Sequence, residues 1–358
     1  MRVLRGRMRG LRLAATHRPA AGTPHVFYGS RRMPGTGDYA WGGLIKCQYL
    51  QQRFPNAPRR FNLLYLVSSL LSWETVPIVR MARRKGVRLV WNQNGVAYPG
   101  WHGPGWERLN APMAALLHEA DQVFYQSHFC RMSADRYLGQ RRGPSEILYN
   151  CVDTRVFTPA AASRDQSLTL LLGGTQAQSY RLESALRALA ELLRRGVRAT
   201  LLVTGRLRWR SHDAHAKQEA SRLVTALGLE EHVKFLGPYR QEEAPAIYQR
   251  AQILLHTKYN DPCPGVVIEA LACGLPVVYS HSGGVPELVG PDAGIGIPAE
   301  LSWERDIPPD PSALAEGVIN ITQDWTRYSE AARQRAVERF DVRPWLKRHQ
   351  ETFEALVR

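Results

Sequence analysis

The residues with the clearest chemical potential are two acidic side chains, Asp261 and Glu269, with seven residues between them. Pro264 stands between the two acids, and proline suits the first turn of a helix, where its missing N–H costs nothing. Gly274 and Pro276 are typical of a helix end. The sequence therefore predicts a helix over residues 265–272, with one carboxylate on the entering loop and the other about one turn inside.

The start of this predicted helix is suited to binding an anion. The backbone N–H groups of Gly265, Val266 and Val267 lie in the first turn, where no intrahelical acceptor is available. Gly265 would also let a phosphate approach the backbone closely. Because carboxylates accept hydrogen bonds from sugar hydroxyls, Asp261 and Glu269 would flank a phosphate cradle with two sugar-binding groups.

Elements that could hold these residues in place alternate along almost the whole chain. Apolar runs of strand length are followed by segments of helical periodicity, which predicts parallel sheets covered by helices. Strands are expected at 25–28, 63–67, 88–91, 122–125, 146–149, 168–172, 200–204, 233–236, 253–256 and 277–279. Helices are expected near 44–53, 76–84, 111–119, 131–137, 181–194, 216–227 and 265–272. In such domains the ligand site lies beyond the carboxyl ends of the strands.

The composition restricts the partners. The chain has 358 residues, 44% of them hydrophobic, and a formal net charge of +15. No apolar run approaches the roughly 20 residues that a membrane span needs. The charge favours anionic partners, namely nucleotide phosphates, an anionic membrane surface or nucleic acid. Because no recognisable nucleic-acid motif accompanies the arginines, we expect no nucleic-acid partner.

Neither the cysteines nor the acids suggest a metal site. The five cysteines are scattered and lack metal-ligand spacing, which favours a reduced cytoplasm. His212 and His215 form a polar HDAH stretch without a third ligand nearby, and we expect it to be a solvated surface. No Asp-x-Asp pair occurs in the sequence. We therefore expect chemistry that needs neither a metal nor another cofactor.

The segment from Asp261 to Gly290 resembles the signature of glycosyltransferase family four. That signature comprises two acids with seven residues between them, an alanine-rich helix, a Gly-x-Pro turn and a Gly-Gly-x-Pro-Glu loop, and Ala270–Pro276 and Gly283–Glu287 match its later parts. The resemblance implies a GT-B fold, with two Rossmann-like doubly wound α/β domains facing each other across a cleft. It also implies a retaining hexosyltransferase with a nucleotide-diphosphate sugar as donor, in which Asp261 contacts the donor sugar and Glu269 the ribose hydroxyls.

Further matches assign the expected domains. A basic leader is expected over residues 1–22, an acceptor domain over 23–150, a linker over 151–166 and a donor domain over 167–340. The stretch 341–358 resembles the family's C-terminal helix, which packs back on the first domain. Gly42 and Gly43 resemble the glycine loop that approaches the donor phosphates, and Gly283 and Gly284 fit the same role.

Three departures from the family pattern concern charged groups. Asp261 stands where most members have glutamate. Thr175 replaces a usual arginine, and the place of a usual lysine falls near Tyr180 and Arg181. The diphosphate must therefore be neutralised from elsewhere, and Arg181 and Arg206 are the candidates. Asn94 lies nearest the position of a histidine that relatives often carry, and we include it among the candidate catalytic residues.

The loop WNQNGVAYPGWHGPGW is expected to contact the acceptor through Tyr98, Trp101 and His102. Aromatic faces suit sugar rings, so a saccharide or lipid-linked saccharide acceptor is favoured. The alternative is that these aromatic residues only pack the loop. Other functions left open are a sugar-nucleotide epimerase on the same fold, a degenerate binding member without catalysis, and a basic nucleic-acid-binding protein.

The expected location is the cytoplasm, either at the inner face of the membrane or free in solution, where the positive charge would only aid nucleotide capture. Six arginines precede Pro19, and this leader lacks the apolar core of a secretion signal. Anionic lipid attracts nearby lysines and arginines. Many members of the family build surface polysaccharides on lipid-linked acceptors, and the resemblance implies that process here.

Overall fold

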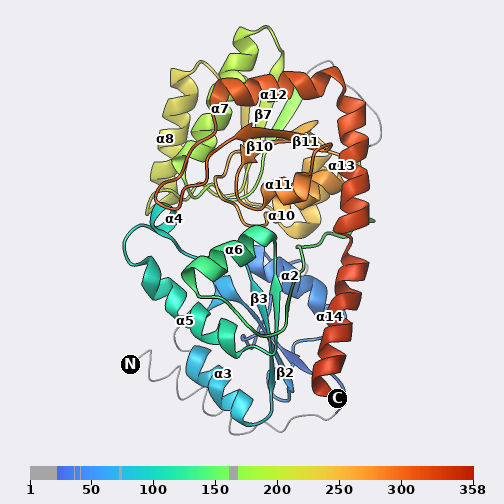
Figure 1. Ribbon diagram of the computed structural model, residues 1–358. Helices are drawn as coiled ribbons and strands as arrows, with labels where there is room; N and C mark the ends of the chain where they lie inside the picture. Colours follow the sequence, from blue (N-terminus) through green and yellow to red (C-terminus); the bar gives the residue numbers. More distant parts are fainter. Residues whose placement is uncertain (1–21, 36, 41, 72–74, 161–167) are drawn as a thin grey trace. The chain divides into compact units, whose positions relative to one another are not determined.

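The chain folds into two compact α/β units (Figure 1). The computed structural model describes residues 22–35, 37–40, 42–71, 75–160 and 168–358. Unit 1 comprises Met1–Asn150, Trp303–Arg305 and Val342–Arg358, and unit 2 comprises Cys151–Ser302 and Asp306–Asp341. Residues 1–21 of the expected leader and residues 161–166 of the expected linker lie outside the described residues.

Unit 1 is built on five parallel strands in the order β1-β2-β3-β4-β5. These strands are β1 (Val26–Phe27), β2 (Leu63–Val67), β3 (Arg88–Gln93), β4 (Gln122–Tyr125) and β5 (Ser145–Ile147). Its helices are α2 (Gly42–Gln51), η1 (Ser68–Leu70), α3 (Thr75–Arg84), α4 (Pro99–His102), α5 (Trp106–Glu119), α6 (His128–Tyr137) and α14 (Val342–Val357). The order of these strands never reverses, so unit 1 departs in this respect from the doubly wound arrangement expected for both domains.

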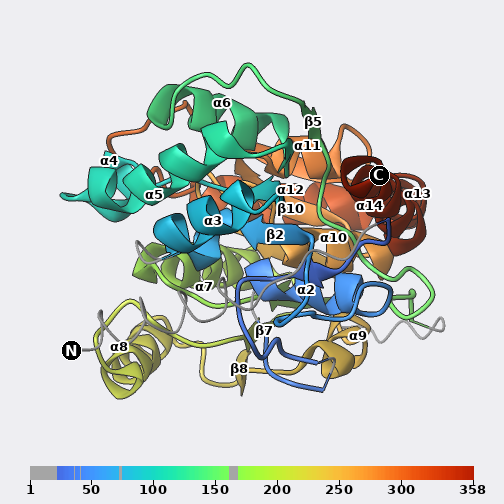
Figure 2. The same ribbon diagram turned by 90° about the horizontal axis from the view of Figure 1, so that it is seen from below.

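Helices cover both faces of this sheet (Figure 2). Alternate side chains of a strand point to opposite faces. Leu64 and Trp91 belong to a core cluster with residues of α3, α5 and α6. On the other face His349 of α14 packs against Phe124 and Tyr65, with its Nε2 3.3 Å from the Tyr65 hydroxyl. The final helix is therefore an integral layer of unit 1.

A short segment from late in the chain completes the first core cluster. Trp303 is buried among Tyr98, Phe129 and Tyr137, with its ring stacked on Phe129 at a centroid distance of 5.4 Å. The Gly100 N–H donates to the Trp303 carbonyl at 2.7 Å. The sequence predicts one domain over all of 167–340, and the three residues Trp303–Arg305 differ from that expectation.

Unit 2 holds six parallel strands in the order β11-β10-β9-β6-β7-β8. They are β6 (Leu168–Leu172), β7 (Ala199–Thr204), β8 (Val233–Gly237), β9 (Ile253–His256), β10 (Val277–His281) and β11 (Gly294–Pro298). Successive strands extend from β6 in one direction and from β9 in the other. The sheet is therefore doubly wound, and its topological switch point lies between β6 and β9.

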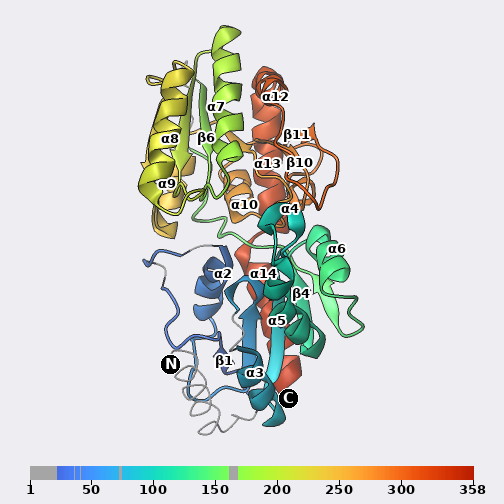
Figure 3. The ribbon, with the colours of Figure 1, turned by 90° about the vertical axis from the view of Figure 1, so that its left-hand side faces the viewer.

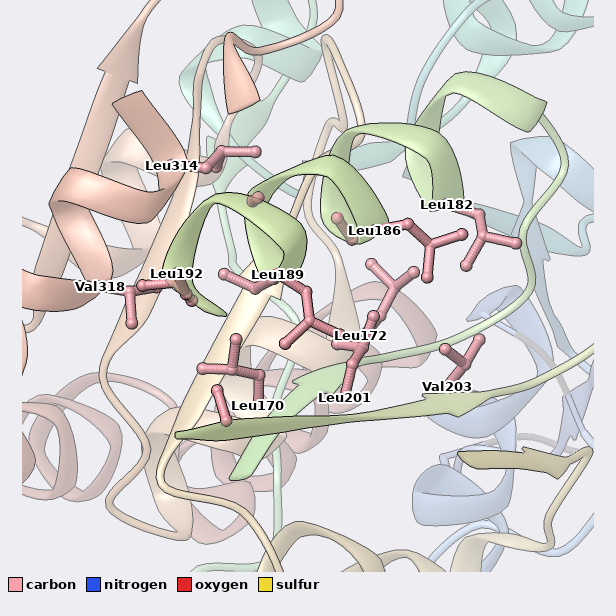
Figure 4. Close-up of a cluster of buried hydrophobic side chains, with 14 of the residues drawn as sticks. Leu170, Leu172, Leu182, Leu186, Leu189, Leu192, Leu201, Val203, Leu314 and Val318 are labelled. Atoms are coloured by element: carbon pink, nitrogen blue, oxygen red, sulfur yellow. The ribbon is translucent and has the colours of Figure 1, made fainter. Parts of the chain in front are cut away.

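Two layers of helices enclose the sheet of unit 2. They are α7 (Ser179–Arg194), α8 (Asp213–Ala226), η2 (Gln241–Glu243), α9 (Ala244–Tyr248), α10 (Gly265–Ala272), α11 (Val285–Val289), α12 (Pro311–Gln323) and α13 (Trp325–Arg339). Figure 3 shows α7 and α8 side by side. Figure 4 shows the leucines of α7 against Leu170, Leu172 and Leu201 of the sheet and beside Leu314 and Val318 of α12. On the opposite face α10 packs against α13.

The amphipathic character of α7 explains this layer. Leu182, Leu186, Leu189 and Leu192 recur at helical spacing and are all buried, whereas Arg187 and Arg194 are exposed. Burying a leucine side chain contributes about 1.5–3 kcal/mol, so this layer is a principal source of unit 2's stability. Among the described residues no helix is long and apolar enough to cross a bilayer.

Candidate active site

The carboxyl ends of β6 and β9 place two loops beside each other at the switch point of unit 2. Gly173 and Gly174 follow β6, and Thr257–Pro264 connects β9 to α10. A Cβ atom at Gly173 would lie 3.5 Å from Val266 Cβ, and one at Gly174 would lie 3.3 Å from Val266 Cγ1. The glycine loop after β6 therefore lies directly against the first turn of α10.

The backbone of Asp261 is fixed by the loop that follows β10. The Gly284 N–H donates to the Asp261 carbonyl at 2.9 Å, and the Asn260 N–H donates to Ser282 Oγ at 2.9 Å. Gly283 has a φ of 66°, and a Cβ there would lie 2.5 Å from the Asp261 carbonyl oxygen. Only glycine fits both the left-handed conformation and this close approach. The predicted residues Gly283, Gly284 and Asp261 thus meet in one place.

The carboxylate of Asp261 lies between two nitrogen atoms of its own loop. Oδ2 is 3.2 Å from His256 Nε2, and Oδ1 is 3.2 Å from Lys258 Nζ. Although this contact is close, His256 Nε2 has no hydrogen-bond partner among the described residues. Burial alone would raise the pKa of Asp261, but Lys258, His256 and Arg181 outweigh burial and hold this pKa well below its usual range. Asp261 is therefore a carboxylate at neutral pH.

The first turn of α10 offers fewer donors than the sequence indicated. Pro264 is the N-cap residue rather than the first helical residue, and it has no N–H. The Val267 N–H donates to the Pro264 carbonyl at 3.2 Å, so the expectation that it points to a ligand is wrong in this conformation. Within the described part of the chain no hydrogen bond reaches the N–H of Gly265 or Val266, and these two remain the donors of the helix start.

Glu269 lies one turn further along α10 and is almost fully buried. Gln241 Nε2 donates to Oε1 at 2.7 Å, and the Tyr248 hydroxyl donates to Oε2 at 2.7 Å. Burial raises the pKa of Glu269, and the hydrogen bonds from Gln241 and Tyr248 oppose that rise. Both carboxylate oxygens are thus held by neutral donors from η2 and α9, with further acceptor capacity on each oxygen.

The two predicted cations differ sharply in environment. Arg181 is buried on α7, and its Nη1 donates to the Thr175 carbonyl at 2.6 Å. Its Nε finds no hydrogen-bond partner among the described residues. Arg206 is exposed, and its carbonyl accepts the Gln176 N–H at 2.8 Å. Arg181 therefore lies under the loop after β6, and Arg206 lies on the surface of unit 2.

In unit 1, Gly43 and Asn94 meet at Ser69. A Cβ at Gly43 would lie 3.0 Å from Ser69 Oγ, so glycine allows α2 to begin against the end of β2. Asn94 Nδ2 donates to Ser69 Oγ at 2.8 Å, and Ser68 Oγ donates to Asn94 Oδ1. Gly42 is exposed, with no atom within 4 Å of the position of its Cβ. The two glycines thus have different roles, one in packing and one at the surface.

The predicted acceptor residues divide into one buried and two exposed side chains. Tyr98 is 4% exposed and packs edge-on against Trp303, so it belongs to the core and the expectation that it contacts an acceptor is wrong in this conformation. Trp101 is 45% exposed. His102 is exposed, with Nδ1 3.3 Å from the Gly103 carbonyl. The loop therefore offers Trp101 and His102 to a ligand.

Sequence reasoning missed four residues of the unit 2 site, namely His256, Lys258, Gln241 and Tyr248. Lys258 could have been identified from the sequence, because a cation three positions before Asp261 in a short loop must lie near that carboxylate. Gln241 and Tyr248 carry no such signal. Among the described residues no group of three or more His, Cys, Asp or Glu side chains could hold a metal ion.

The sequence of this chain matches the profile of a known protein family. The profile of the family described as glycosyl transferases group 1 matches residues 159–338, just over half of the chain. The chain belongs to this family. The family resemblance predicted from the sequence is thereby confirmed.

Curated relatives of this glycosyl transferase group 1 protein match it in part. A GDP-mannose-dependent alpha-(1-6)-phosphatidylinositol monomannoside mannosyltransferase from Mycolicibacterium smegmatis is 29% identical over 237 residues, 58% of this chain and 56% of that protein. A D-inositol 3-phosphate glycosyltransferase from the same organism is 32% identical over 184 residues, 49% of this chain and 41% of that protein. The chain thus spans about half the length of these relatives.

Two solved structures of other proteins share the fold. Sucrose-phosphate synthase from Thermosynechococcus elongatus has a TM-score of 0.68 at 19% identity, covering 88% of this chain and 76% of that one. HepE from Anabaena, solved in complex with UDP-glucose, has a TM-score of 0.65 at 20% identity, covering 87% and 82%. The predicted GT-B fold is confirmed by these neighbours and by the two parallel-sheet units.

Proposed function

We propose that this glycosyl transferase moves a sugar from a nucleotide-diphosphate sugar to a saccharide or lipid-linked saccharide. The observation that carries the proposal is the first turn of α10, which presents the N–H groups of Gly265 and Val266 with a carboxylate on each side, Asp261 before it and Glu269 within it. A helix start is suited to a phosphate, and carboxylates are suited to sugar hydroxyls.

Unit 2 is proposed to bind the donor. HepE was solved with UDP-glucose, and the mannosyltransferase relative is GDP-mannose-dependent, so both are users of nucleoside diphosphate sugars. By analogy, Glu269 would accept hydrogen bonds from the ribose hydroxyls, and Asp261 would lie against the sugar. Gly283 and Gly284 would let the diphosphate approach the backbone of their loop.

The proposed reaction breaks the bond between the anomeric carbon and the diphosphate oxygen. The electron pair of that bond stays with the leaving diphosphate, while positive charge develops on the sugar. Fixed dipoles and cations stabilise such a leaving group. Retention of configuration and independence from metal ions are part of the proposal, supported by the family membership and by the lack of an Asp-x-Asp pair in the sequence.

Unit 1 is proposed to bind the acceptor. Trp101 has an exposed indole face, which can stack on a sugar ring. The phosphatidylinositol monomannoside in the relative's name is a lipid-linked saccharide, which supports an acceptor of that class. We further propose surface polysaccharide synthesis at the cytoplasmic face of a membrane, because the net charge of +15 favours anionic lipid.

A two-stage experiment tests the proposal. A thermal-shift screen with UDP, GDP and their sugars identifies the donor, because a ligand that binds only the folded state raises the melting temperature. Release of nucleoside diphosphate from that donor is then measured with saccharide acceptors in excess EDTA. Stabilisation followed by acceptor-dependent release supports the proposal. A melting temperature that no nucleoside diphosphate raises would contradict it.

A further inference from the structure

Thr175 stands at the family's usual arginine position, and the place of its usual lysine falls near Tyr180 and Arg181. The Thr175 carbonyl accepts a hydrogen bond from Arg181 Nη1 at 2.6 Å. The Tyr180 hydroxyl accepts the Tyr259 N–H at 3.0 Å. Both residues therefore support the loops after β6 and β9 through neutral acceptors. A leaving diphosphate would still need a positive charge close to the start of α10.

Three basic residues of unit 2 are candidates for that charge. Arg206 is on the surface after β7. Arg181 is 4% exposed and already donates to the Thr175 carbonyl, so its guanidinium is held beneath the loop that follows β6. Lys258 lies in the loop that enters α10, and its side chain is 23% exposed. Lys258 combines access to solvent with a contact to Asp261, the carboxylate that precedes the first turn of α10.

The contacts of Lys258 hold its side chain close to the site. Its Nζ lies 3.2 Å from Asp261 Oδ1, the carboxylate that precedes the first turn of α10. The imidazole of His256 lies at the other carboxylate oxygen of Asp261. Burial lowers the pKa of His256, so this imidazole is uncharged at neutral pH. Lys258 is therefore the cation of this three-residue cluster, and its flexible four-carbon stem lets the ammonium turn toward a ligand.

We propose that Lys258 neutralises the leaving diphosphate of the donor, in the role for which the sequence suggested Arg181 or Arg206. The inference rests on the proposed function. As the bond from the anomeric carbon to the diphosphate breaks, its electron pair remains on the diphosphate oxygen. The acceptor oxygen forms the new bond to the anomeric carbon, and its proton passes to the diphosphate. The ammonium of Lys258 keeps all its protons and donates hydrogen bonds to the phosphate oxygens.

The test compares nucleoside diphosphates with monophosphates. Affinities of the full chain for UDP, UMP, GDP and GMP are measured by calorimetry for the wild type, Lys258→Met and Lys258→Arg. Charged hydrogen bonds of this kind correspond to about 10- to 100-fold in affinity. We expect Lys258→Met to lower the diphosphate affinity by at least about 10-fold while the monophosphate affinity changes little. Lys258→Arg should retain most of the diphosphate affinity.

Two further comparisons isolate the charge of Lys258. Lys217 is exposed on α8, and Lys217→Met should leave every affinity unchanged. In an Asp261→Asn background, Lys258→Met should still weaken diphosphate binding. No further loss in that background would show that Lys258 only positions Asp261, which overturns the inference. If Lys258→Met lowers the melting temperature, Lys258→Gln serves in the same comparison.

The possible failures are distinguishable. Unchanged diphosphate affinity in Lys258→Met, or equal losses of monophosphate and diphosphate affinity, would overturn the inference while leaving the proposed function standing. Failure of the wild type to bind UDP or GDP would instead contradict the proposed function itself.

Discussion

The Tyr248 hydroxyl donates a 2.7 Å hydrogen bond to Oε2 of Glu269, and both side chains are buried. Tyr248 ends α9, and Glu269 lies in the middle of α10. The bond therefore fixes the rotamer of the carboxylate that we assign to the ribose. Tyr248 acts through Glu269, so it is a positioning residue.

Tyr248→Phe removes this donor and should weaken nucleotide binding by about 10-fold, because hydrogen bonds to charged groups contribute about 1.5–3 kcal/mol. It should also raise the pKa of Glu269 further, since the Tyr248 bond opposes the rise caused by burial. The binding affinity should then begin to fall at a higher pH than in the wild type. Calorimetry between pH 5 and 8 checks both effects. The control is Tyr328→Phe, on α13, which should bind like the wild type at every pH.

Gly283→Ala should destabilise unit 2 more than alanine substitution of a left-handed glycine without close neighbours does. Gly283 and Gly228 share a φ of 66°, but only Gly283 of these two has close neighbours, with the Asp261 carbonyl 2.5 Å from its would-be Cβ. Gly228→Ala carries the backbone cost alone, about 1 kcal/mol, and Gly283→Ala should exceed that by about 1–3 kcal/mol. Urea denaturation of the two variants measures the difference. Equal midpoints would contradict the role of Gly283 in holding the Asp261 loop.

Asp261→Asn should change how stability depends on acidity. The folded pKa of Asp261 is lowered, so its ionisation stabilises the folded state above the unfolded value, near pH 3.8, and this stability is lost as the pH falls through the folded value. The wild type should therefore exceed the variant in melting temperature by a constant amount between pH 7 and 5. The gap should narrow below about pH 4. A gap independent of pH down to pH 2 would show that the ionisation of Asp261 contributes nothing to the stability of the folded state.

Trp101→Ala should affect the acceptor and not the donor. The indole is 45% exposed, so its removal leaves the core of unit 1 intact and should change the melting temperature little. The KM for a saccharide acceptor should rise by roughly 10-fold, the loss of about 1–2 kcal/mol of ring stacking, with the KM for the donor unchanged. Tyr98→Ala, at a buried neighbour, should instead lower the melting temperature by several degrees.

The helix α10 could be predicted from the sequence because its signals are local. Gly274 and Pro276 follow its last turn, and the observed bounds Gly265–Ala272 are those expected. Strand β11 was missed, since Gly294–Pro298 contains two glycines and a proline, which are weak strand formers. Local signals thus located the acidic residues and their helix, but not every strand of the sheet.

Contacts between distant residues were beyond prediction. The bonds of Gln241 and Tyr248 to Glu269 join residues 28 and 21 positions apart, with no pattern in the sequence to announce them. Tyr98 was assigned to an acceptor surface because an aromatic loop looks the same in sequence whether exposed or packed. Its burial depends on Trp303, which enters the core of unit 1 from far along the chain.

The decisive measurement for the donor site is the affinity of Glu269→Ala for the nucleoside diphosphate that the wild type binds. We expect a loss of about 10- to 100-fold, since the carboxylate is assigned to two ribose hydroxyls. Glu316→Ala, which removes an exposed carboxylate of α12, should bind as the wild type does. Circular dichroism should show both variants folded. A folded Glu269→Ala protein that binds UDP or GDP as tightly as the wild type would contradict the assignment of the donor to the first turn of α10.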